Sequence, residues 1–171
     1  MKIYDITKVA SISKIKPEIA HVYVKHTNDG LIYVATDTYR LVEVFIESEE
    51  IKGILKEGFY DLKDWKRLSK ETQKKNPDEE IILDIEPLDV DWTFPKYEQI
   101  LPQKTKEVET IFNRVDVNLW IDIVKILEKF TGLPYNRITE KIVESEKGRM
   151  IYFEDWKGES KIKTLIMPLN K

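Results

Sequence analysis

The chain has 171 residues, 42% hydrophobic and 35% charged, and its 28 lysines and arginines against 31 acidic residues give a net charge of −3. This composition is typical of a globular protein, and it argues against long disorder and against positive charge spread over the whole surface. No apolar run approaches a membrane span, no secretory signal is evident, and the lack of cysteine excludes disulfides and thiolate metal sites. We therefore expect a cytoplasmic protein.

The first part of the chain predicts a short helix followed by strands. Residues 5–14 have helical spacing, with Asp5 as the N-cap. Asn28-Asp29-Gly30 predicts a hairpin turn, because these residues tolerate positive φ. Segments rich in Val, Ile and Tyr flank this turn and predict strands at residues 19–26, 31–36 and 41–47.

The rest of the chain predicts two longer helices and more strands, which together indicate an α+β fold. A helix is expected at 62–75 after Asp61, and a clearer one at 117–131, which Gly132 ends. Residues 94–102 are bounded by prolines and predict an extended connector or turn. Further strands are expected at 80–86, 137–144, 149–155 and 161–169.

The common catalytic patterns are missing. The six glycines are scattered at turns, so there is no phosphate-binding loop, and His21 and His26 fall on opposite faces of a strand. Oxygen-rich clusters can bind a hard cation, but Pro87 interrupts the geometry of the four acids nearby, and a charged strand edge explains them better: Asp84, Glu86, Asp89 and Asp91. We expect neither an enzyme nor a cofactor, although a small enzyme of unrelated class stays a less favoured alternative.

Three separated motifs carry a resemblance to a known family. Residues 31–42 read LIYVATDTYRLV, residues 94–102 read FPKYEQILP, and residues 165–169 read LIMPL. In this order they resemble the bacterial β sliding clamp, the processivity subunit of the replicative polymerase. Residues 59–68 and 115–127 also resemble the repeated helices of that family. Thr38 and Tyr39 stand where the family motif has Gly and His, and Asn170 stands where a basic residue is usual.

The resemblance implies a DNA-clamp-like α+β fold with antiparallel sheets and helices packed on one face. It implies two units, residues 1–102 similar to the family's middle domain and residues 103–171 similar to the second half of its last domain. It also implies a pocket in which polymerases or clamp-loader-type proteins insert a short linear peptide. The pocket residues carried over are Thr36, Thr38, Tyr39, Arg40, Leu41, Pro95, Ile100, Met167, Pro168 and Leu169.

Clamp helices meet DNA phosphates without reading bases, so the resemblance also implies non-specific contact with double-stranded DNA. The expected contacts lie on the helix at 62–75: Lys63, Lys66, Arg67, Lys70, Lys74 and Lys75. Uncovered strand edges pair readily, which predicts a symmetric homo-oligomer. The alternative function is a regulator or decoy that binds clamp-recognition peptides without encircling DNA.

Overall fold

A computed structural model describes residues 2–12, 15–47, 55–74, 85–102, 106–107, 116–134, 137–138, 141–145 and 148–167. These residues form one eight-stranded antiparallel sheet in the order β4-β1-β2-β3-β8-β7-β6-β5. The strands are β1 (Val22–His26), β2 (Leu31–Thr36), β3 (Arg40–Ile46), β4 (Gly58–Tyr60), β5 (Lys106–Glu107), β6 (Lys141–Ser145), β7 (Gly148–Lys157) and β8 (Ser160–Ile166).

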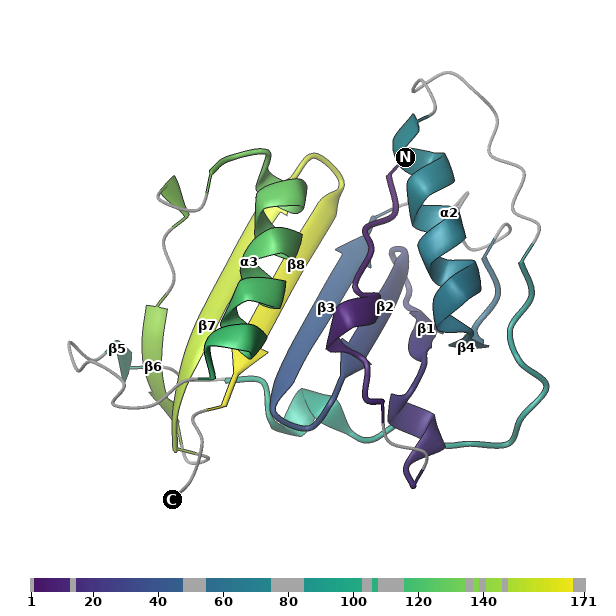
Figure 1. The fold of residues 1–171 in the computed structure, drawn as a ribbon, viewed down its shortest axis with the longest axis horizontal. Coiled ribbons are helices and arrows are strands. Elements are labelled where there is room, and N and C mark those ends of the chain that lie inside the picture. The colour runs from purple at the N-terminus through teal and green to yellow at the C-terminus, as the bar shows by residue number, and fades with distance from the viewer. Residues whose placement is uncertain are drawn as a thin grey trace.

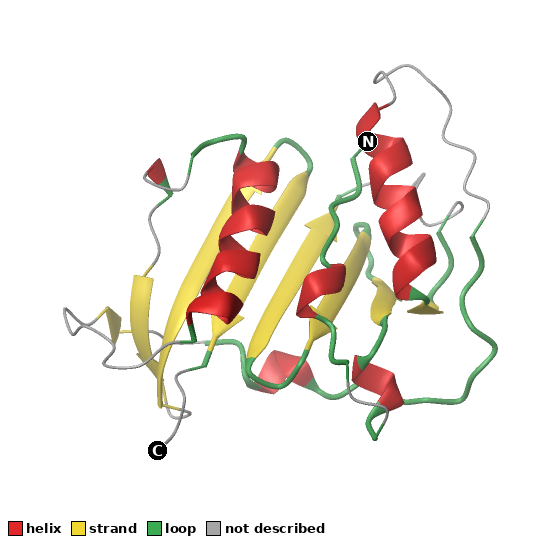
Figure 2. Cartoon of the chain, in the orientation of Figure 1, coloured by secondary structure: helices red, strands yellow, loops and turns green. Residues whose placement is uncertain are grey.

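Two α-helices, α2 (Leu62–Lys74) and α3 (Val117–Thr131), cover one face of this sheet (Figure 1). The single-turn 3₁₀ helix η1 (Thr7–Val9) lies between them, and η2 (Pro17–Ile19) and η3 (Tyr97–Gln99) lie near the end of the sheet at the β2–β3 turn (Figure 2). The predicted α+β class, with helices on one face of an antiparallel sheet, is confirmed. No helix among the described residues is long and apolar enough to span a membrane.

Capping residues set both ends of α3. Asp116 caps α3 by accepting a hydrogen bond from the Asn118 N–H at 2.8 Å, and Gly132 ends it at φ 74°. The inward side chains of α3 pack with those of α2, including the fully buried Trp65, in a helix-side core beneath both helices. Both predicted helices are therefore confirmed over the described residues, and Lys75 lies outside them.

One predicted element is wrong, and another lies mostly outside the described residues. The helix expected at 5–14 is a single 3₁₀ turn, because Ala10 is extended (ψ 147°) and Ser11 donates its N–H to the Ile19 carbonyl at 2.8 Å. Ile85 and Glu86 belong to no strand, although residues 80–86 predicted one; residues 80–84 lie outside the described residues. The remaining strands appear with small shifts of their ends.

The sheet joins two halves through one strand pair. β3 pairs with β8 over seven residues, from Arg40 opposite Ile166 to Ile46 opposite Ser160. The strands of the C-terminal half thus extend the sheet of the N-terminal half. We call the β3–β8 pair the seam, because the candidate site lies along it.

The connector, residues 85–102, passes from the β4 edge onto the face opposite the helices. Its Phe94 and Tyr97 are buried in a second cluster with Val34, Leu41 and Leu165, here called the connector-side core. Alternation along β3 explains the two cores, since Leu41 and Glu43 point to the connector while Val42 and Val44 point to the helices.

Candidate functional site

The three motif segments meet at one end of the seam. Leu41 on β3 lies opposite Leu165 on β8, and the Met167 N–H donates to the Tyr39 carbonyl at 2.7 Å. Ile100 from the connector and Met167 pack against the connector-side core that holds Leu41 and Leu165. Segments separated by about 60 residues or more in sequence are therefore neighbours in space, as a shared peptide site requires.

The predicted peptide-binding residues differ in how accessible they are. Leu41 is only 1% exposed within the connector-side core, Ile100 and Met167 are half-buried against that core, and Tyr39 is 54% exposed in the β2–β3 turn. Pro95 is exposed in the connector. Pro168 and Leu169 lie outside the described residues, and peptide binding at this surface stays a prediction.

The β2–β3 turn is held by its own side chains. The Thr36 hydroxyl is buried; it donates to the Arg40 carbonyl at 2.8 Å and accepts the Thr38 N–H at 3.2 Å. Asp37 accepts the N–H groups of Tyr39 and Arg40, each at 3.0 Å. Thr38 is left with φ 80°, a left-handed conformation that glycine adopts more readily. The site of the motif's Gly-to-Thr difference is thus the strained residue of this turn.

Arg40 points away from the other predicted peptide-binding residues, towards the helices. Its guanidinium is bonded to the Asp37 carboxylate at 2.9 Å, to the Asp122 carboxylate of α3 at 2.9 Å and to the Lys8 carbonyl at 2.6 Å. A residue that is 8% exposed and bonded in this way ties the turn, α3 and η1 together. In the described structure the Arg40 side chain is structural and does not line the surface around Leu41.

The opposite face of the seam has its own charge pair. Glu43 on β3 and Lys163 on β8 are cross-strand partners, and the Lys163 ammonium donates to the Glu43 carboxylate at 2.7 Å. The Glu43 side chain is 5% exposed, so this bond compensates a charge that burial would otherwise penalise. Burial raises the pKa of the nearby Tyr97 hydroxyl far above its ordinary value, and the charge of Glu43 raises it further. The Glu43–Lys163 pair therefore links β3 to β8 across the seam, and local sequence patterns do not reveal it because its partners lie 120 residues apart.

The basic residues predicted for the helix at 62–75 lie, where described, on the exposed side of α2. Five of the predicted DNA-binding residues are exposed along α2 and line a shallow hollow of about 360 Å³ with Glu71: Lys63, Lys66, Arg67, Lys70 and Lys74. Trp65, Leu68 and Thr72 occupy the buried side of the same helix. The sixth residue, Lys75, lies outside the described residues, and contact with DNA stays a prediction.

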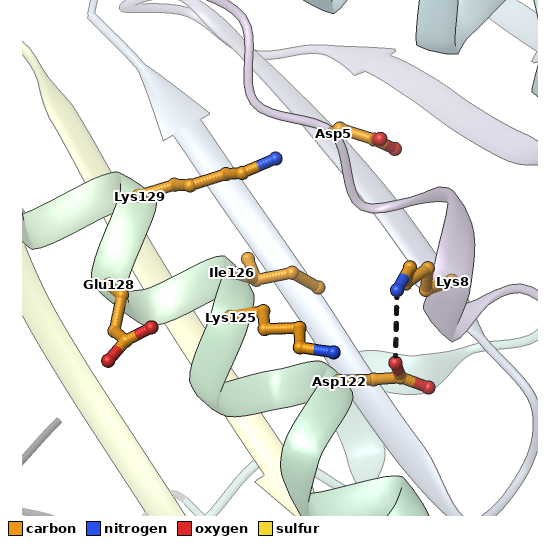
Figure 3. A pocket seen from close by; sticks show the side chains of 7 residues that line it. All are labelled: Asp5, Lys8, Asp122, Lys125, Ile126, Glu128 and Lys129. Carbon is orange, nitrogen blue, oxygen red and sulfur yellow. Dashed lines mark ion pairs between the residues drawn. The ribbon is translucent and has the colours of Figure 1, made fainter.

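A second hollow of about 290 Å³ lies between η1 and α3 (Figure 3). Three lysines and three acids line it with Ile126, and one ion pair, Lys8 with Asp122 at 3.5 Å, spans it. The charges lining this hollow balance. Those of α3 itself also balance, two lysines against two acids, so α3 lacks the basic excess of α2. Sequence patterns gave no sign of this hollow, because η1 and α3 lie more than 100 residues apart in the chain. No group of three His, Cys, Asp or Glu side chains suited to a metal occurs in the part of the chain that the structure describes.

Comparisons with known proteins define the fold. No family model and no curated protein sequence matches the chain. Among solved structures it is similar to the DNA polymerase sliding clamp from Bacillus subtilis, with a TM-score of 0.51 and 15% sequence identity. The match covers 98% of this chain but only 60% of the clamp chain. The chain therefore has a DNA-clamp-like fold.

Proposed function

We propose that the chain is a clamp-like recruitment factor that binds short linear peptides at the end of the seam. The observation that carries this proposal is that Leu41, Ile100 and Met167, from three distant segments, share one apolar cluster, beside the exposed Tyr39 whose carbonyl accepts the Met167 N–H. Leu, Ile and Met side chains form an adaptable wall for the Leu or Phe anchor of a peptide. Polymerase or clamp-loader-type proteins are the partners this chemistry suits. The divisions at residues 1–102 and 103–171 are part of the same proposal.

The test is binding of a labelled peptide with a Leu-Phe anchor, followed by fluorescence anisotropy. We expect a dissociation constant in the micromolar range, about 8 kcal/mol of binding free energy. Met167→Ala and Tyr39→Ala should each weaken binding about tenfold, because truncating an anchor contact costs about 1–2 kcal/mol. Both side chains are at least partly accessible, so these variants disturb the fold less than Leu41→Ala.

The matched control is Trp156→Ala. Trp156 is 50% exposed on β7 and contacts Phe45, at the end of the seam opposite Met167. The Trp156→Ala variant should bind the peptide with an unchanged dissociation constant. Equal losses in all three variants, or no loss in the first two, would contradict the proposed site.

We further propose that α2 contacts duplex DNA without sequence preference. The supporting observation is its outward row of five basic residues against two acids, Asp64 and Glu71. Binding should be weak and should fall steeply with salt, because it depends on releasing counterions from the phosphates. Reversing Lys66, Arg67 and Lys70 to Glu should abolish gel retardation at low salt. Reversing Lys25, Lys96 and Lys141 to Glu removes the same charge away from the helices and should have a much smaller effect.

The alternative is a regulator or decoy that binds the peptides without touching DNA. The balanced charges of α3 and the net charge of −3 favour it over a chain that surrounds DNA with basic helices. Peptide binding that survives with no retardation of DNA at low salt would select this alternative.

A further inference from the structure

An open sheet has two outer edges, and the chain covers one of them with its own connector. The outermost strand on that side is β4, whose Phe59 lies opposite Tyr23 of β1. The Leu88 N–H donates to the Phe59 carbonyl at 2.8 Å. In an antiparallel ladder the backbone N–H and C=O of one residue point to the same side. The backbone groups of Phe59 therefore point away from β1, towards the outer edge of the sheet. Its carbonyl is the group an added strand would need.

Close packing fixes the connector along this edge. Gly58 has φ 144°, and a Cβ there would lie 2.7 Å from the Cβ of Pro87, so only glycine permits this approach. Pro87 itself offers no N–H to an incoming strand. The exposed pair of Lys56 with Glu86, at 2.7 Å, holds the preceding residue and contributes little stability.

Aromatic contacts anchor the continuation of the connector. The ring of Trp92 meets Phe59 edge-on with centroids 5.7 Å apart, and Phe94 stacks on Tyr23 at 4.9 Å. Contacts of this kind stabilise the segment beyond the area they bury. The segment from Ile85 to Phe94 is therefore held both along the edge and on the face beside it. Figure 1 shows it as the teal trace that descends past β4.

We propose that residues 85–88 form an edge cap that closes β4 to strand addition by a second copy of this chain. Head-to-tail assembly through the sheet requires two different edges to meet, β4 of one copy and the β5/β6 side of the next. With β4 closed, copies associate through their sheets only by a two-fold contact in which the β5/β6 side meets itself. The cap thus restricts the symmetric oligomer that the sequence predicts to a pair. It goes beyond the proposed function, because neither peptide nor DNA contact uses the β4 edge.

Single cysteines test this geometry cleanly, since the chain has none of its own. Glu57→Cys marks the β4 edge and Lys141→Cys marks the start of β6, both at exposed positions. After mixing and mild oxidation at high micromolar concentration, we expect no enrichment of the disulfide that joins position 57 to position 141. Light scattering should give a mass no larger than that of a pair. A dominant 57–141 disulfide, or a mass of three copies or more, overturns the proposal.

Removing the cap should allow head-to-tail growth. Leu88→Pro deletes the N–H that bonds to Phe59, and Gly58→Ala places a Cβ where Pro87 now packs. Each variant should form species that lengthen with concentration and carry the 57–141 disulfide. Asp89→Pro is the control, because it places the same ring one residue further along. If Leu88→Pro fails to fold by circular dichroism, Gly58→Ala decides. A folded variant that keeps the mass of the unsubstituted chain overturns the proposal.

Discussion

Replacing Arg40 by methionine removes the tie between the β2–β3 turn, α3 and η1 while keeping a side chain of similar length. The change deletes hydrogen bonds to Asp37, Asp122 and the Lys8 carbonyl. It leaves two carboxylates, whose side chains are 16% and 26% exposed, without their main partner.

Breaking a fully buried charge pair costs about 3–5 kcal/mol. Because Asp37 and Asp122 keep some contact with water, we expect a loss of about 2–3 kcal/mol in the free energy of unfolding. For a chain of this size that corresponds to a fall in Tm of about 4–12 °C. Urea unfolding followed by tryptophan fluorescence measures the loss directly, with an unchanged m-value showing that compactness is unaltered.

A double-mutant cycle isolates the bond to α3. Arg40→Met, Asp122→Asn and the double variant should give a coupling energy of about 1–2 kcal/mol, as expected for residues in one network. Arg67→Met is the matched control, since Arg67 meets Asp64 at 3.4 Å on the exposed face of α2 and should change stability by less than about 0.5 kcal/mol. An Arg40→Met loss as small as that of the control, or strictly additive variants, would refute the structural role assigned to Arg40.

Three further predictions concern backbone strain, close packing and pH. Thr38→Gly should stabilise the chain by up to about 1 kcal/mol in urea unfolding, because it relieves a left-handed conformation that costs about 1–2 kcal/mol while adding glycine's entropy loss on folding; a destabilised variant would contradict this. Gly30→Ala should cost at least about 3 kcal/mol, since its Cβ would lie 2.0 Å from the carbonyl oxygen of Ile46, and thermal unfolding measures the loss. Burial raises the pKa of Tyr33 and Tyr97 above the ordinary value of 10. The contribution of these neutral phenols to the free energy of unfolding is therefore complete below pH 10 and is lost as pH rises towards their pKa in the folded chain. Absorbance at 295 nm should therefore show these phenols ionising only as the chain unfolds, and ionisation in the folded state near pH 10 would contradict this.

The sequence determined the local elements well where one periodic pattern ran for several turns or residues. The bounds of α3 follow from the helical spacing over 117–131 and from Gly132, because periodicity and capping are properties of neighbouring residues. The strands at 31–36 and 40–46 were predictable for the same reason. The helix at residues 5–14 was wrongly predicted, because Ser11 in that segment donates its N–H to Ile19 outside it, and this bond outweighs a weak helical pattern.

The candidate site was predictable only in part, because its motifs identify residues but not the directions of their side chains. Leu41, Ile100 and Met167 meet, whereas Arg40, next to Leu41 in sequence, points to the other face of the sheet and bonds to Asp122. Alternation along β3 allows one of two orientations for the whole strand, and the packing of α3 and the connector selects between them. The partner of Glu43 was likewise hidden, since it lies 120 residues away on β8.

Local patterns in the sequence thus fixed the helices, most strands and the basic face of α2, all of which depend on residues close together in the chain. Tertiary structure alone decided the seam, the Glu43–Lys163 pair across it, the bonds of Arg40 to α3 and η1, and the capped β4 edge. Each of these depends on contacts between distant segments, and their free energies are gained only when the whole sheet has formed.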